Sequence, residues 1–227
     1  MSDFLDSNTS PYSIHRVAVM GQQHDKKIGE WFGPNSIAHV LSALAKNDFR
    51  ADIKIHVAND GVIYKSKIRD SFVEKSGQGL DQGLLVLVPI RLGVDTLNPT
   101  YFKALHDFFT LECCAGIAGG RPHSSLYFVG SEGDANLIYL DPHYIRNCNS
   151  DINLAVPVKS VDSYEKLDLV SYHCDKVRLL PLTSMDPSMV LGIYIKNLRG
   201  FDDFCECYEK VWLSYADVYR WEVDVFR

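Results

Sequence analysis

The spacing of apolar residues along the chain predicts four helices. The clearest follows Gly33-Pro34-Asn35-Ser36, where apolar residues recur from Ile37 to Leu44 with a period of about 3.6 residues. Asn98-Pro99 predicts the start of another, because asparagine caps helices and proline suits the first helical position. The predicted helices cover residues 33–46, 65–73, 98–110 and 201–215.

Shorter apolar or alternating runs predict strands between these helices. Residues 84–90 are almost wholly apolar and have the length of a strand buried on both faces. A turn at residues 59–61 joins two short strands, and residues 131–136 join the strands of a hairpin. The predicted strands cover residues 52–57, 62–64, 84–90, 125–129, 137–140, 176–180 and 191–195. Helices mixed with antiparallel strands predict one α+β domain over residues 1–227.

Three stretches are predicted to lie outside helices and strands. Residues 7–13 form an extended lead-in, residues 116–122 form a glycine-rich loop, and residues 146–175 form a long surface loop.

Composition and charge narrow the class of protein. Of the 227 residues, 46% are hydrophobic and 23% are charged, which is ordinary for a soluble globular protein. The net charge of −6, without a dense lysine and arginine cluster, disfavours nucleic acid and anionic membranes as partners. The first ten residues have neither the basic segment nor the apolar core of a secretory signal, and no apolar run is long enough to span a bilayer. We therefore expect a cytoplasmic protein without a transmembrane segment.

The six cysteines are sparse for a chain of this length, and we expect them to be reduced thiols. Cys205 and Cys207 are separated by one residue instead of the two of a zinc knuckle, and no second Cys/His pair has ligand spacing. We expect neither a metal nor another cofactor.

Asp141-Pro142-His143, at the end of a predicted strand, is the main candidate for catalytic chemistry. Residues i and i+2 of an extended chain point to the same face, so the carboxylate can accept a hydrogen bond from one imidazole nitrogen. That bond fixes the tautomer and leaves the other nitrogen facing a nucleophile. Taken by itself, the tripeptide is more often a strand-end turn with a surface histidine.

Five sequence blocks in a fixed order give this tripeptide a context. They are Tyr12-Ser13-Ile14-His15, Gly29-Glu30-Trp31-Phe32-Gly33-Pro34-Asn35, Val88-Pro89-Ile90-Arg91-Leu92-Gly93, Gly119-Gly120-Arg121-Pro122 and Leu137-Ile138-Tyr139-Leu140-Asp141-Pro142-His143. Together they closely resemble the autophagins, the autophagy-related cysteine peptidases with a papain-like fold. The resemblance runs from about Phe4 to the last predicted helix.

The resemblance implies a function. Autophagins cut a ubiquitin-like autophagy modifier after a glycine near its C-terminus, and later release the modifier from phosphatidylethanolamine. His143 would be the general base that activates a cysteine thiol, and Asp141 would orient it. The partners would be the modifier precursor and its lipid-conjugated form, with at most transient access to a membrane.

The resemblance also suggests substrate-binding residues. Trp31 matches the tryptophan that covers the substrate glycine, and Pro122 matches the loop residue that closes against it. A slot roofed by an indole admits only glycine, and Gly119 and Gly120 would let the loop lift. The alternative for Trp31 is a core aromatic residue beside a helix start.

The sequence departs from the family at the nucleophile. In autophagins the catalytic cysteine lies upstream of the Tyr12 block, in an Asp-x-Gly-Trp-Gly-Cys motif at a helix start, and no Gly-Trp-Gly-Cys occurs here. Of the cysteines present, only Cys113 and Cys114 merit testing as substitutes. We expect an incomplete chain that lacks the nucleophile-bearing segment and is inactive alone. The loss of this nucleophile-bearing segment should expose an apolar face around residues 84–90 and 137–140.

Two alternatives remain open. One is a non-catalytic pseudopeptidase that holds the ubiquitin-like modifier without cutting it. The other is a docking motif of the aromatic-x-x-aliphatic type at Tyr215-Ala216-Asp217-Val218, a match that helix packing explains equally well.

Overall fold

The computed structural model describes residues 2–48, 53–73, 83–145 and 173–213. The helices are α1 (Ile14–Gly21), α2 (Pro34–Asn47), α3 (Lys65–Val73), α4 (Phe102–Phe108) and α5 (Leu198–Leu213), with short 3-10 turns at Ser2–Phe4, Gln22–His24, Pro99–Tyr101 and Leu182–Ser184. The strands are β1 (Ile53–Val57), β2 (Gly83–Arg91), β3 (Cys114–Arg121), β4 (Ser124–Glu132), β5 (Asn136–Leu140), β6 (Leu179–Pro181) and β7 (Ser188–Ile195).

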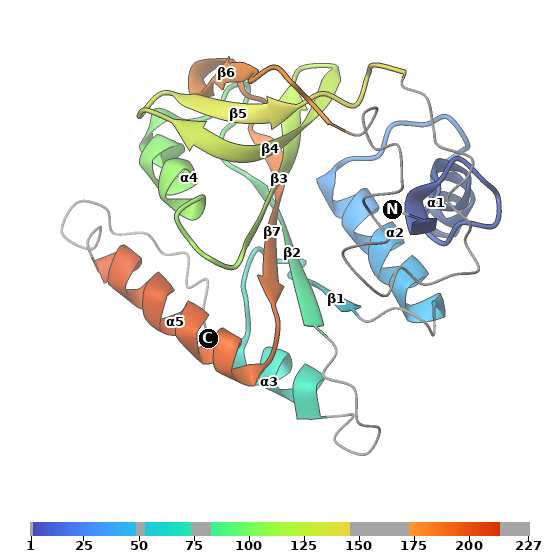
Figure 1. Cartoon of the computed structure of the whole chain (residues 1–227), viewed down its shortest axis with the longest axis horizontal. Helices are drawn as coiled ribbons and strands as arrows, with labels where there is room; N and C mark the ends of the chain where they lie inside the picture. The colour runs from blue at the N-terminus through green and yellow to red at the C-terminus, as the bar shows by residue number, and fades with distance from the viewer. Residues whose placement is uncertain (1, 49–52, 74–82, 146–172, 214–227) are drawn as a thin grey trace.

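These strands form one sheet with helices on both sides. Within the described residues the strand order is β1-β2-β7-β3-β4-β5-β6. Figure 1 shows α1 and α2 on one side of the sheet and α3, α4 and α5 on the other. This mixed architecture confirms the α+β class and is consistent with the papain-like fold.

Strand β2 shows why the sheet needs cover on both faces. Leu84, Val86 and Val88 are buried in the larger core, with residues of α4 and α5. Leu87 points to the opposite face, where it packs with Ala38 of α2. Since successive side chains of a strand alternate between faces, a continuous apolar run is what a strand in this position requires. The predicted buried strand is confirmed.

The pairing of β1 differs from the prediction. The turn at residues 59–61 forms, with the amide of Gly61 donating to the carbonyl of Ala58 at 3.0 Å. Beyond it, however, Ile63 makes only an isolated bridge and the chain enters α3. The predicted hairpin is therefore wrong. Instead β1 pairs with β2 in parallel, because α3 lies between them in the chain and permits a crossover.

The chain before α2 is more helical than predicted. Residues 7–13 form successive turns instead of an extended lead-in, with the amide of Ser13 donating to the carbonyl of Ser10 at 3.2 Å. Ser13 then caps α1, since its side chain accepts a hydrogen bond from the amide of Arg16 at 3.3 Å. Helix α1 was missed because its residues carry only a short apolar pattern.

The predicted glycine-rich loop at residues 116–122 is wrong, because most of it is strand β3. Strands β7 and β4 flank β3 and supply backbone partners on both edges. Only Pro122 and His123 separate β3 from β4, and the positive φ of 65° at His123 is that of a type II turn after proline. A Cβ at Gly120 would lie 2.0 Å from the Ser124 carbonyl oxygen, so this glycine permits a close backbone approach.

Candidate active site

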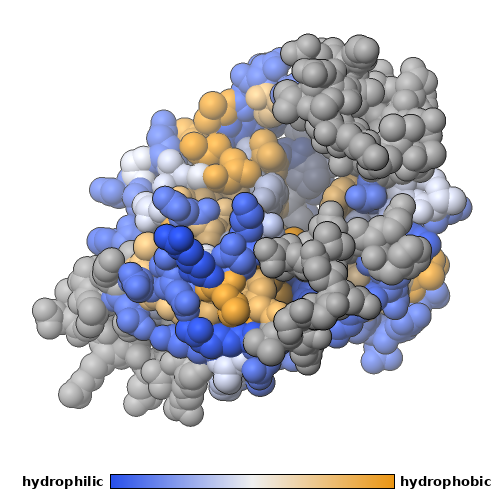
Figure 2. Space-filling model, turned by 60° about the horizontal axis from the view of Figure 1, so that its bottom comes forward, coloured by the Kyte–Doolittle hydropathy of each residue, from blue (hydrophilic) through white to orange (hydrophobic). Residues whose placement is uncertain are grey.

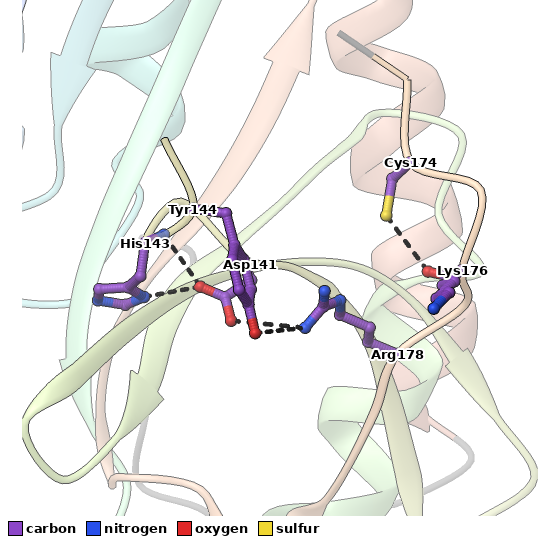
Figure 3. Close-up of polar contacts among 6 residues, drawn as sticks. All are labelled: Asp141, His143, Tyr144, Cys174, Lys176 and Arg178. Atoms are coloured by element: carbon purple, nitrogen blue, oxygen red, sulfur yellow. Dashed lines mark hydrogen bonds and ion pairs between the residues drawn. The ribbon is translucent and has the colours of Figure 1, made fainter. Parts of the chain in front are cut away.

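Asp141 and His143 lie in a turn immediately after β5. Asp141 Oδ1 accepts a hydrogen bond from the backbone amide of His143 at 3.0 Å and contacts His143 Nδ1 at 2.7 Å (Figure 3). The predicted proximity of the two side chains is confirmed, but the expected cause is wrong. Strand β5 ends at Leu140, and an aspartate turn brings the side chains together instead of the pleat of a strand.

The electrostatics of the pair fix the direction of its hydrogen bond. The backbone amide of His143 does most to lower the pKa of Asp141, and the hydrogen bond from the His143 side chain lowers it further. Asp141 is therefore a carboxylate at neutral pH and can only accept, so Nδ1 is the donor. The Nε2 atom remains available to take a proton. The His143 side chain is 49% exposed, which gives a reacting group access to it, whereas Asp141 is 12% exposed.

The register of the sheet places the β3–β4 turn at the same end as this pair. Ala118 pairs with Tyr127, and Tyr127 pairs with Leu140, so these residues form one row across three strands. Strands β3 and β5 run in the same direction from that row. Asp141 follows Leu140, just as Gly119, Gly120 and Pro122 follow Ala118. The sheet therefore brings the candidate loop residues to the end where His143 lies.

Trp31 lies in the segment that leads into α2 and is 59% exposed. The alternative that it is a core residue is therefore wrong. Its helix runs from the middle of the sheet outward, since Ala38 packs on Leu87 and Val190 whereas the Ser42 hydroxyl donates to the Ile55 carbonyl at 3.1 Å. The start of α2, and Trp31 before it, thus lie toward the middle strands.

Cys113, Cys114 and Cys174 are poor partners for His143. Burial raises the pKa of Cys113 to about 11 and also raises that of Cys114, whereas an activated thiol needs a lowered pKa. The register places Cys114 about five residue rises, roughly 16 Å along the strands, from Asp141. Cys174 directs its Sγ to the Lys176 carbonyl at 3.3 Å, on the far side of Asp141 from His143 (Figure 3).

Two residues beside the pair were missed by the sequence analysis. The Arg178 guanidinium lies over the Tyr144 ring, 4.7 Å from its centroid, and its Nη1 is 3.8 Å from Asp141 Oδ2. Arg178 lies within the strand predicted at residues 176–180, and Tyr144 directly follows the Asp141-Pro142-His143 motif. Only the pairing of β5 with β6 brings them together, and the sequence does not reveal that pairing.

Two further structural findings bear on the kind of protein. In the parts of the chain described above, no three His, Cys, Asp or Glu side chains cluster in a way that could hold a metal ion. Among the same residues, no helix has both the length and the apolar character needed to cross a membrane.

The mixed fold, with an aspartate–histidine pair after a strand, is consistent with the class of papain-like cysteine peptidases, in which a histidine oriented by an acid activates a thiol. The chain belongs to the family of the Peptidase C54 catalytic domain, which it matches over residues 1–207. This match confirms the autophagin resemblance.

Curated relatives carry names that agree with this family. The chain is 34% identical over 220 residues to "Cysteine protease atg4da" of Danio rerio, covering 96% of this chain and 42% of that protein. It is 35% identical over 213 residues to "Probable cysteine protease atg4" of Aspergillus niger, covering 93% and 50%. It is 33% identical over 243 residues to "Cysteine protease ATG4B" of Xenopus laevis, covering 98% and 60%. The chain thus spans about half the length of these relatives.

Proposed function

We propose that this chain is part of a cysteine endopeptidase of the autophagy pathway. Its substrate is a ubiquitin-like autophagy modifier, which it cleaves after the C-terminal glycine and releases from phosphatidylethanolamine. The observation that carries the proposal is the 2.7 Å contact between His143 Nδ1 and Asp141 Oδ1, in a chain of the Peptidase C54 family. Here His143 is the general base and Asp141 the residue that orients it.

The chemistry follows from the free Nε2 of His143. Nε2 removes the proton of a cysteine thiol, and the thiolate attacks the carbonyl carbon of the substrate glycine. The resulting intermediate expels an amine, which takes the proton from Nε2 and leaves a thioester. Water then attacks the thioester, again with Nε2 as base, and releases the glycine carboxylate and the thiol. The leaving amine is a peptide nitrogen in the precursor and the ethanolamine nitrogen in the lipid form.

Trp31 and Pro122 are proposed to select glycine at the cut site. Support comes from the exposure of Trp31, which leaves its ring free to cover a substrate, and from the place of Pro122 at the His143 end of the sheet. Gly119 and Gly120 act here by allowing tight packing within β3, because both are paired to β4. Any movement of this hairpin would centre on the Pro122–His123 turn.

The thiol is proposed to come from a part of the protein outside these 227 residues, and the chain alone to be inactive. An uncovered apolar area supports this, because Tyr127, Val129 and Leu140 are 42–44% exposed on one face of β4 and β5. The prediction of an exposed apolar face around residues 84–90 is wrong for the face of β2 that α2 covers. There α2 packs on Leu87, which is only 7% exposed. Among the described residues, this exposed apolar area on β4 and β5 is continued on β6 by Leu179, which is 39% exposed and pairs with Ile138.

Cleavage of a purified modifier precursor, and of its lipid-linked form on vesicles, tests the proposal. The assay uses the longest in-frame product of the gene. We expect its reading frame to encode a Gly-Trp-Gly-Cys block. His143→Ala should lower the cleavage rate by about 10²–10⁴-fold, because it removes the general base.

His15 provides a matched control. It contacts Asp6 Oδ1 through Nε2 at 2.8 Å, so it forms a second exposed histidine–aspartate pair. Cleavage should be unchanged in His15→Ala. If the parent protein binds the modifier without cutting it, the protein is a pseudopeptidase; if His143→Ala cleaves normally, the assigned base is wrong.

A further inference from the structure

The carboxylate of Asp141 uses its two oxygens differently. Oδ1 accepts both hydrogen bonds from His143, at 3.0 Å from the backbone and 2.7 Å from the ring. Oδ2 faces the Arg178 guanidinium, with the nearest nitrogen at 3.8 Å. The χ2 torsion of aspartate, which rotates the carboxylate, has a broad and roughly two-fold distribution. A partner on one oxygen alone therefore leaves the carboxylate able to rotate about this bond. A cation at the second oxygen restrains this rotation.

The backbone holds Arg178 at this position. The Tyr139 amide donates to the Arg178 carbonyl at 3.0 Å, which continues the β5–β6 ladder beyond the Ile138–Leu179 pair. Directly opposed residues of antiparallel strands point to the same face, and Asp141 lies two residues after Tyr139. The Arg178 side chain therefore projects on the side where the carboxylate lies.

The Tyr144 ring limits the freedom of the Arg178 side chain. The guanidinium carbon is 4.7 Å from the ring centroid, and Nη1 is 3.4 Å from the Tyr144 hydroxyl. A planar guanidinium stacks on an aromatic face, which an ammonium group does less well. Tyr144 immediately follows His143, so the turn that forms the pair also carries the platform for its cation. Figure 3 shows Asp141 between His143 and Arg178.

We propose that Arg178 is a positioning residue that, held by Tyr144, fixes the Asp141 carboxylate and thereby the Nδ1–H tautomer of His143. The inference rests on the proposed function only for its purpose in catalysis, since the tautomer can be measured without any substrate. It assigns a role to a residue outside the aspartate–histidine pair.

The imidazole ¹⁵N shifts of His143, measured by NMR in the folded protein near pH 8, report the tautomer directly. The signal is assigned by its loss in His143→Gln. Arg178→Gln should lower the ratio of Nδ1–H to Nε2–H by about two- to fivefold, the range expected for one partly exposed ion pair. Arg178→Lys should restore part of the ratio, because it keeps the charge but stacks poorly.

Matched variants separate a positioning role from a structural one. Arg199→Gln removes an exposed arginine at the start of α5 and should leave the ratio unchanged. Tyr144→Leu removes the exposed ring on which the Arg178 guanidinium stacks, and it should lower the ratio as Arg178→Gln does. If Arg178→Gln fails to fold, Tyr144→Leu tests the positioning role of Arg178.

The outcomes distinguish the two proposals. An unchanged ratio in Arg178→Gln and Tyr144→Leu, with a lowered ratio in Asp141→Asn, overturns the role of Arg178 and leaves the proposed function intact. An unchanged ratio in Asp141→Asn as well overturns the orienting role of Asp141, and with it both proposals.

Discussion

At the scale of single residues, one oxygen atom in the turn after β5 both stabilises the backbone turn and orients the histidine ring. Asp141 Oδ1 accepts from the amide of His143 and from its ring, so the bond that shapes the backbone also orients the imidazole. Pro142 between them has a fixed φ and no amide hydrogen, which suits a chain leaving a strand. The geometry of the pair is therefore local and needs few distant contacts to form.

The lowered pKa of Asp141 predicts a pH dependence of stability. The folded pKa lies below the unfolded value of about 3.9, so the contribution of this carboxylate is complete above that value and is lost as the pH falls through the folded pKa. In urea unfolding from pH 7 to pH 2, the stability difference between the parent and Asp141→Asn should be constant above about pH 5 and shrink below about pH 4.

Asp95→Asn, which removes an exposed carboxylate, is the control for that experiment. A difference between the parent and Asp141→Asn that stays constant down to pH 2 would show that the Asp141 carboxylate is not stabilised in the folded state.

The Asp141–His143 pair could be predicted from the sequence, whereas the approach of Arg178 to Asp141 could not. Asp141 and His143 are two positions apart, so a motif can reveal them. Arg178 reaches Asp141 only through the pairing of β6 with β5, and β6 is a three-residue strand with no periodicity of its own. Chemistry that depends on strand pairing leaves no spacing signal in a single sequence.

At the scale of elements, the β3–β4 hairpin shows how glycine is used for close packing. Its register continues without interruption from Ile117 opposite Phe128 to Arg121 opposite Ser124. Near the turn, Gly120 has a φ of 157° and leaves no room for a side chain. The glycine content predicted a loop because glycine is depleted in strands, but here the neighbouring backbone excludes a Cβ.

Gly120→Ala should therefore destabilise the protein by about 1–3 kcal/mol, because the new methyl group would overlap the Ser124 carbonyl. Gly130→Ala in the adjoining strand is the matched control. Its Cβ would meet Ile138 Cδ1 at an ordinary 3.6 Å, so stability should stay the same or rise by up to about 1 kcal/mol. Denaturant unfolding of both variants measures the difference, and equal effects would contradict the packing argument.

Strand β5 offers a second matched pair, because it carries the same residue type on opposite faces. Leu137 is 1% exposed in the larger core, whereas Leu140 is 42% exposed. Leu137→Ala should cost about 2–5 kcal/mol of unfolding free energy through the cavity it leaves. Leu140→Ala should cost less than about 1 kcal/mol. Comparable losses in denaturant unfolding would mean that the outer face is also packed in solution.

Elements with a strong period or cap were predictable, and the others were not. The predicted helix at residues 65–73 matches α3, and Asn98 caps the helical segment as expected, accepting from the Thr100 amide at 3.1 Å. Helix α5 begins three residues before the predicted start, and the predicted docking motif at Tyr215–Val218 lies outside the described residues. The parallel pairing of β1 escaped prediction because sequence alternation does not encode strand direction.

At the scale of the whole molecule, the two faces of the sheet are covered unequally. The larger core joins residues of α3, α4 and α5 to most of the strands, whereas α2 covers mainly β1, β2 and β7 on the other face. Figure 2 shows that apolar residues also reach the surface seen from below, in patches separated by polar ones. Among the described residues, the face that α2 covers is therefore the more exposed of the two over β4 and β5.

Two ion pairs tie the helices of the larger core at the surface. Lys65 pairs with Glu209 at 2.8 Å and Arg69 with Asp202 at 2.5 Å, which joins α3 to α5. These side chains are substantially exposed, so each pair contributes at most about 1 kcal/mol. The buried aromatic rings of Phe201 and Phe204 do more to hold α5 in place.

The position of β7 in the middle of the sheet has a consequence during synthesis on the ribosome. Leu84 of β2 pairs with Ile195, and Ala118 of β3 pairs with Val190, so β7 joins β1 and β2 to the strands from β3 to β6. Of the strands that the structure describes, β7 is translated last. Until it emerges, the nascent chain presents two unpaired strand edges, which are sites of aggregation and of chaperone binding. A premature stop codon before Ser188 would therefore remove the strand between β2 and β3 and leave both of these strand edges unpaired.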